Sequence, residues 1–273
     1  MSQKIMNAAG NETAVKFLCG AFGRARINFR GRRPGRGGGQ WNIRTSVLCV
    51  FLAMHLTPSS AARGYTGHIP PNLSSAFQPA ANQAFHPGVS HPALFGTTEI
   101  KATDLAYFTK WTSVMSRFGA QMKGSGAGSP AVLAWLARLR TLRDKSDREK
   151  MEGVNDYMNS IAYVDDRSNY GVGDYWATPI EFLARGGDCE DYAIAKYASL
   201  RALGFAPDQL RVTVVRDKVG NEMHVMLVVY SNEGVFILDN QDRRLRRMEN
   251  VTRYKATFSL NSENWWLYKA GAA

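Results

Sequence analysis

The residue best suited to nucleophilic chemistry is Cys189, which follows Gly186-Gly187 and Asp188. The glycine pair ends one helix and Asp188 is a favourable N-cap, so Cys189 is predicted to open a helix over 189–203. Unpaired N–H groups and the helix dipole at that position favour a thiolate and lower the thiol pKa. The alternative is a small buried side chain, the role of most free cysteines, but three neighbouring acids disfavour that environment. We therefore predict that Cys189 is a reactive nucleophile.

A thiolate nucleophile needs a proton shuttle, and His224 is the only histidine after position 91. It lies in the apolar stretch 223–230, which is typical of a central strand. A lone histidine on such a strand is usually a core residue, so an acidic neighbour has to support the functional interpretation. His224 is the predicted general base.

Asp239 is the acid predicted to orient His224, and it ends the apolar run 235–239. If Tyr230 pairs with Val235 across a symmetric turn, Asp239 is the diagonal neighbour of His224 on one sheet face. An odd-length turn or a bulge would break this parity, and the alternative role for Asp239 is that of a turn residue. In the functional interpretation its carboxylate sets the imidazole tautomer and stabilises the imidazolium.

The elements that carry these residues change type along the chain. Helical periodicity and N-cap signals come before position 203, and β-branched or apolar runs come after it. Helices are predicted over 105–118, from 130, over 145–161, from 179 and over 189–203, and strands over 210–216, 223–230, 235–239, 254–260 and 265–268. This order predicts the α+β class, with helices followed by an antiparallel sheet, in one domain over 97–273.

Residues 1–62 are predicted to be a leader with a secretory signal peptide. A basic flank ending at Arg44 precedes a short apolar run, and small residues follow up to a cleavage point after Ala62. The run is shorter than the roughly 20 residues that span a bilayer, so no membrane span is expected in the mature chain. A buried core helix is the alternative. Residues 63–96 are rich in Pro, Gly and Ser and are predicted to be an irregular arm.

Charge and cysteine content support export and exclude one class of partner. The net charge is +11, but residues 1–62 contain nine Lys/Arg and one acid, which leaves +3 for the rest. That balance gives no reason to expect nucleic-acid binding. Cys19 and Cys49 lie in the leader, so the mature chain has a single thiol, Cys189, and no internal disulfide. The predicted location is the bacterial periplasm or the exterior.

Several motifs together resemble the bacterial transglutaminase-like cysteine peptidases, the LapG-type family. They are Asp174-Tyr175-Trp176-Ala177-Thr178-Pro179, Gly187-Asp188-Cys189-Glu190-Asp191-Tyr192, Met223-His224-Val225, Ile237-Leu238-Asp239-Asn240 and the pair Trp265-Trp266. The resemblance covers roughly 97–267 and implies a papain-like fold, a periplasmic location and a protein substrate. It also implies the release of large surface adhesins in biofilm formation, under a regulatory membrane protein.

The same resemblance implies that Asp188 and Glu190 bind calcium. Adjacent carboxylates at a loop-to-helix junction suit a hard cation, although calcium takes 6–8 oxygen ligands and these two residues supply only part of them. The alternative needs no metal, because Asp188 can act as N-cap and Glu190 as a first-turn acid. No organic cofactor is expected. Trp176 is a candidate for the wall of the substrate cleft or an oxyanion donor, with hydrophobic packing as its alternative.

Three functions remain open at the level of sequence. The first is an exported endopeptidase that uses Cys189, His224 and Asp239 through a thioester acyl-enzyme. The second is a protein transamidase or amidase on the same three residues, because an amine can replace water as the acceptor. The third is a non-catalytic exported binding domain.

Overall fold

The computed structural model describes residues 92–270. The predicted leader and nearly all of the predicted arm therefore lie outside the described residues. Within residues 92–270, no helix combines the length and the apolar character that crossing a membrane requires.

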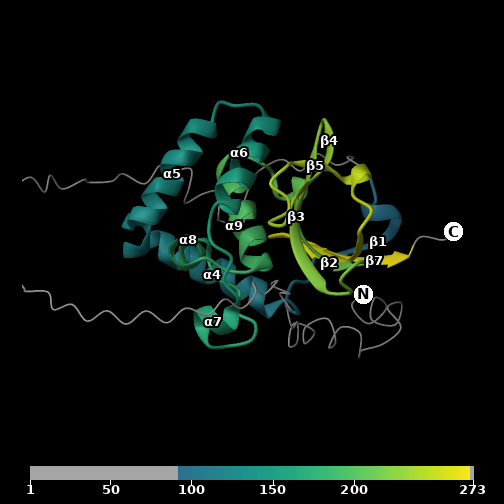
Figure 1. Cartoon of the computed structure of the whole chain (residues 1–273), viewed down its shortest axis with the longest axis horizontal. Helices are drawn as coiled ribbons and strands as arrows, with labels where there is room; N and C mark the ends of the chain where they lie inside the picture. The colour runs from purple at the N-terminus through teal and green to yellow at the C-terminus, as the bar shows by residue number, and fades with distance from the viewer. Residues whose placement is uncertain (1–91, 271–273) are drawn as a thin grey trace, which may run out of the picture. The chain divides into compact units, whose positions relative to one another are not determined.

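Apart from the first strand, the helices precede the strands of a single antiparallel sheet, as the sequence predicts (Figure 1). The helices are α4 (Thr109–Lys123), α5 (Pro130–Leu142), α6 (Asp147–Asn159), α7 (Asp166–Tyr170), α8 (Pro179–Arg185) and α9 (Cys189–Ala202). The strands are β1 (Thr97–Ala102), β2 (Leu210–Asp217), β3 (Met223–Ser231), β4 (Gly234–Leu238), β5 (Arg246–Arg247), β6 (Tyr254–Leu260) and β7 (Trp265–Ala270). Their order in the sheet is β1-β7-β6-β2-β3-β4-β5. The α+β class is confirmed.

Local capping signals account for several helix starts. The predicted capping box at α8 is present, because the Glu181 N–H donates to Thr178 Oγ1 at 3.2 Å and the Thr178 N–H donates to Glu181 Oε2 at 2.8 Å. Ser129 caps α5 with a single contact, its hydroxyl accepting from the Val132 N–H. These contacts fix where the helices before Cys189 begin.

Two features near the start of the domain differ from what the sequence predicts. The helix predicted over 105–118 begins four residues later, at Thr109, because Asp104 accepts from the Ala106 N–H and closes a local turn instead of capping a helix. The strand β1 was not predicted. It is a short, mostly polar edge strand whose side chains are only partly buried against β7, so it lacks a clear apolar alternation.

Helix α9 is the centre of the fold, and nearly all of its residues are buried. It packs against α6 and α8 on one side and against β2 and β3 on the other (Figure 1). The sheet has a hydrophobic core on each of its two faces. Successive residues of β3 point to opposite faces, since side chains alternate across a strand. Val225 and Leu227 face the helices, and Met226 faces a second core on the opposite side of the sheet.

Candidate active site

Cys189 is the first residue of α9, as predicted, and it is a free, half-buried cysteine. The chain reaches it through Gly186, whose φ of +77° favours glycine, and Gly187. Both glycines allow close backbone approach. A Cβ on Gly186 would lie 2.4 Å from the Ala162 carbonyl oxygen, and a Cβ on Gly187 would lie 2.2 Å from Asp191 Oδ2. The Gly-Gly turn thus brings the helix start against the neighbouring loop.

The thiol of Cys189 lies at the open edge of β3. Strand β4 pairs with β3 only from Leu227 onward, because β4 ends at Leu238. The N–H of Val225, past that end, is directed at the sulfur of Cys189, where it helps to stabilise a thiolate. The Cys189 thiol therefore sits beside the residue that follows His224.

His224 and Asp239 meet as the hairpin parity predicts. Tyr230 pairs with Val235, and the register continues without a shift to Leu227 and Leu238. His224 Nε2 lies 2.8 Å from Asp239 Oδ1, and both side chains are buried. Burial alone would raise the pKa of Asp239, but the hydrogen bond and positive charge of His224, with further donors, lower it to about 2. Asp239 is therefore ionised at neutral pH.

The thiol pKa differs from the prediction made from the helix start alone. Burial, the negative charges of Glu190 and Asp188, and a hydrogen bond to Glu190 raise the pKa of Cys189 well above its usual value. The thiol lies 3.2 Å from Glu190 Oε2 and donates to it. Burial of the thiol and the two adjacent carboxylates therefore outweigh the helix dipole, which by itself favours a thiolate.

The predicted metal ligands belong to a larger cluster of acids. Ligand oxygens of Asp166, Asp174 and Glu190 lie within 4.8 Å of one another, and so do those of Asp166, Asp188 and Asp191. Asp166 is the first residue of α7 and Asp174 lies in the loop before α8. Sequence reasoning did not identify either residue as a metal ligand, because both lie in segments that precede the helix of Cys189. Their only signal was a run of acids in a polar loop.

The cluster has the features of a cation site. Within the described residues, Asp166 Oδ1, Asp174 Oδ1 and Asp188 Oδ1 are buried and have no hydrogen-bond partner. Burial and neighbouring negative charges raise the pKa of Asp188 to about 10. Burial is also the main cause that raises the pKa of Glu190 to about 7. Orphaned buried carboxylate oxygens are costly, and a hard cation with oxygen ligands would satisfy them. The residues present therefore fit calcium.

Comparison with known proteins identifies the family. The model of the bacterial transglutaminase-like cysteine proteinases (BTLCP) matches residues 136–270. Among solved structures, LapG of Legionella pneumophila is 32% identical over 56% of this chain and 87% of LapG, with a TM-score of 0.47. This chain belongs to the bacterial transglutaminase-like cysteine proteinases. The predicted family and the predicted enzyme class, a cysteine peptidase, are confirmed.

Two further structures of Legionella pneumophila LapG match this proteinase. The calcium-bound form is 30% identical over 59% of this chain and 90% of LapG, with a TM-score of 0.48. The EGTA-treated form is 32% identical over 57% of this chain and 86% of LapG, with a TM-score of 0.47. No curated protein matches the chain.

Trp176 is buried in the core between the helices and the sheet of the proteinase. Its carbonyl oxygen accepts from Arg117, and the next residue, Ala177, donates its N–H to Asp191 at 2.7 Å. This placement favours the packing alternative, although the indole Nε1 has no hydrogen-bond partner among the described residues. The role of Trp176 in the cleft stays a prediction.

Lys196 is a buried charge that sequence reasoning missed. It lies two helical turns after Cys189, and within the described residues its Nζ has no hydrogen-bond partner. Burial lowers the pKa of Lys196 to about 7, and the negative charge of Asp239 opposes that shift. Its helical position was visible in the sequence, but nothing in the sequence showed that a lysine there would be enclosed.

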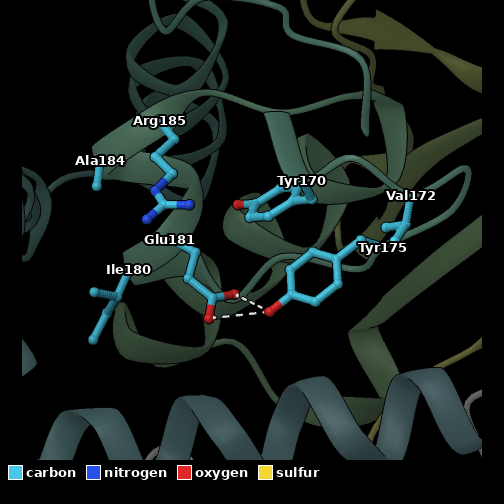
Figure 2. Close-up of a pocket in the computed structure, with 7 residues that line it drawn as sticks. All are labelled: Tyr170, Val172, Tyr175, Ile180, Glu181, Ala184 and Arg185. Atoms are coloured by element: carbon cyan, nitrogen blue, oxygen red, sulfur yellow. Dashed lines mark hydrogen bonds between the residues drawn. The ribbon is translucent and has the colours of Figure 1, made fainter. Parts of the chain in front are cut away.

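A surface pocket of about 480 Å³ lies on α7, α8 and the loop between them (Figure 2). Its lining residues are Tyr170, Val172, Tyr175, Ile180, Glu181, Ala184 and Arg185. The Tyr175 hydroxyl donates to Glu181, which also pairs with Arg117 of α4 (Figure 2 shows the tyrosine contact). Cys189, His224 and Asp239 are not among the lining residues, so this pocket is separate from the candidate active site.

Proposed function

We propose that this cysteine peptidase is an exported endopeptidase in which Cys189 is the nucleophile, His224 the general base and Asp239 the residue that orients the base. The observation that carries this proposal is the 2.8 Å contact between His224 Nε2 and Asp239 Oδ1, one residue before the Val225 N–H that is directed at the Cys189 sulfur. With Nε2 engaged by the carboxylate, Nδ1 is the nitrogen left to exchange a proton with Cys189.

The reaction follows from these roles. The Cys189 thiolate attacks the scissile carbonyl carbon, and the carbonyl oxygen becomes an oxyanion that the Cys189 N–H at the helix start can stabilise. His224 donates its proton to the leaving amine, which departs and leaves a thioester. Water then gives a proton to His224 and attacks the thioester, releasing the acid and the thiolate.

We propose that Asp188 and Glu190 hold calcium, joined by Asp166 and Asp174. The buried carboxylate oxygens without hydrogen-bond partners support this assignment. Calcium is bound by one form of LapG, a relative of this chain. When bound, the cation supplies positive charge that balances the carboxylates around the thiol. Asp191 has a separate role, because both of its oxygens accept backbone N–H groups, from Ala177 and Asp188.

The location and substrate extend the proposal. The leader pattern over 1–62 supports export to the periplasm with cleavage after Ala62. The resemblance to LapG-type enzymes supports a large surface adhesin as substrate and a membrane protein as regulator. N-terminal sequencing of protein recovered from the periplasm tests the first point: a chain beginning near position 63 is expected, and one beginning at Met1 would contradict export.

Comparison of surface and secreted proteins by mass tests the endopeptidase itself. Cells with the intact gene and cells with Cys189→Ala should differ in one shortened surface protein, whose two fragments sum to the parent mass plus one water. A fragment carrying an added amine would instead favour the transamidase. Identical profiles would contradict the proposal.

A further inference from the structure

The carboxylate of Asp239 is held by more than His224. Its Oδ1 also accepts from the Gln241 N–H at 2.9 Å, and its Oδ2 accepts from the Tyr254 hydroxyl at 2.7 Å. Three donors on two oxygens fix the plane of the carboxylate and therefore the direction in which it presents Oδ1 to the imidazole. The Tyr254 donor comes from β6, which β2 and β3 separate from β4 in the sheet.

The same tyrosine contacts the imidazole. The rings of Tyr254 and His224 are stacked, with centroids 5.7 Å apart and planes 24° from parallel. Tyr254 is buried in the second core. One rigid side chain thus touches both the proposed base and the proposed orienting acid, through its ring and through its hydroxyl.

A β-bulge places Tyr254 on the correct face of the sheet. Opposite β2, Val214 pairs with Phe258 but Val215 pairs with Ala256, so Thr257 is the extra residue. Phe258 faces the helices, whereas Ala256 and Tyr254 face the second core. If the same residues paired with β2 without a bulge, strict alternation would place Tyr254 on the face of Phe258, which is the helix side. Bulges re-aim side chains next to active sites, and this one aims the phenol at Asp239.

The electrostatic surroundings keep the phenol as a donor. Burial and the negative charge of Asp239 raise the pKa of Tyr254 above its usual value, so its hydroxyl stays protonated at neutral pH. Arg253 lies over the Tyr254 ring at 5.0 Å, but its guanidinium is paired with Asp217. The contact from phenol to carboxylate is therefore a charge-assisted hydrogen bond inside the protein.

We propose that Tyr254 is a positioning residue of this proteinase, which holds Asp239 through its hydroxyl and His224 through its ring. The proposal rests on the triad assigned above. It predicts that removing the Tyr254 hydroxyl slows the chemical step, and that this effect depends on Asp239, because the hydroxyl contacts the carboxylate and not the thiol.

The test is a double-mutant cycle of Tyr254→Phe and Asp239→Asn, with peptide cleavage and the rate of iodoacetamide alkylation as readouts. Tyr254→Phe keeps the stacked ring and removes the donor, so we expect kcat to fall about tenfold with KM unchanged. In the Asp239→Asn background the same change should have almost no further effect, because the acceptor it serves has lost its charge.

Tyr268→Phe is the matched control. Tyr268 is buried in the same core and its hydroxyl is also hydrogen-bonded, to Arg211 and Ser259, away from the triad. It should leave kcat within about twofold of the parent, with a comparable change in melting temperature.

Three outcomes would overturn the inference. They are an unchanged kcat in Tyr254→Phe, a tenfold loss that persists in the Asp239→Asn background, and unfolding of Tyr254→Phe, which would make the hydroxyl a requirement of the fold. Full activity in Asp239→Asn alone would refute the triad, which is a different failure.

Discussion

The Cys189 thiol lies 3.2 Å from Oε2 of Glu190, the next residue in the chain. The proposed nucleophile and a proposed metal ligand are therefore in direct contact. A negative charge on one disfavours a negative charge on the other, while a cation bound to the acid relieves that repulsion. We therefore expect metal binding and thiol reactivity to be coupled through this pair.

Calcium should increase the reactivity of the thiol. In EGTA, burial, Glu190 and Asp188 hold the pKa of Cys189 above its usual value, so alkylation by iodoacetamide at pH 7 should be slow. Calcium should lower that pKa and raise the alkylation rate about tenfold or more, whereas magnesium should not, because it retains its waters. The measurement is the alkylation rate against pH in both conditions. Identical curves would show that the acids and the thiol are not coupled through a metal.

The stability of the calcium-free protein should fall as pH rises. Burial, chiefly, raises the pKa of Glu190 to about 7, of Asp191 to about 8 and of Asp188 to about 10. An acid with a raised folded-state pKa stabilises the fold at low pH, and that contribution is lost as pH rises through the folded value. In EGTA the melting temperature should therefore drop between pH 6 and pH 10, and saturating calcium should remove most of the drop. A flat profile in EGTA would contradict the clustered arrangement.

Asp166 is predicted to bind calcium although it lies far from Cys189 in the sequence. Asp166→Asn keeps an oxygen for the Tyr175 N–H and removes the charge, so calcium affinity by calorimetry should fall roughly 10- to 100-fold. Asp165→Asn is the control, because Asp165 caps α7 and asparagine caps a helix equally well. Equal affinities in the two variants would remove Asp166 from the site.

Variants of the triad should separate catalysis from folding. Cys189→Ala and His224→Ala should each abolish peptide cleavage and keep the circular dichroism spectrum of the parent, since the two residues act as one unit. Asp239→Asn should retain a measurable fraction of the activity, because the Asp239 side chain orients the imidazole and does not itself react. Near-normal cleavage by His224→Ala would show that another group moves the proton.

Local signals in the sequence were sufficient for much of the site. Asp188 and the Gly-Gly turn predicted that Cys189 opens a helix, because caps and turn residues act within a few positions. The meeting of His224 with Asp239 followed from the parity of a short hairpin, which depends only on alternation and on the turn. Both predictions involve residues close in sequence or in one hairpin.

The three-dimensional fold decided what lies between distant segments. Asp166 and Asp174 join Asp188 and Glu190 only because α7 and the loop before α8 pack beside the start of α9. The fold also buries the thiol, and this burial is the first cause of the raised pKa of Cys189, to which Glu190 and Asp188 add. Tyr254 reaches Asp239 only because of the bulge at Thr257, and no local pattern in the sequence predicts that bulge. The sequence by itself determined the chemical groups and their local geometry. The tertiary structure determined the charges around them, because electrostatic interactions depend on distance in space and not along the chain.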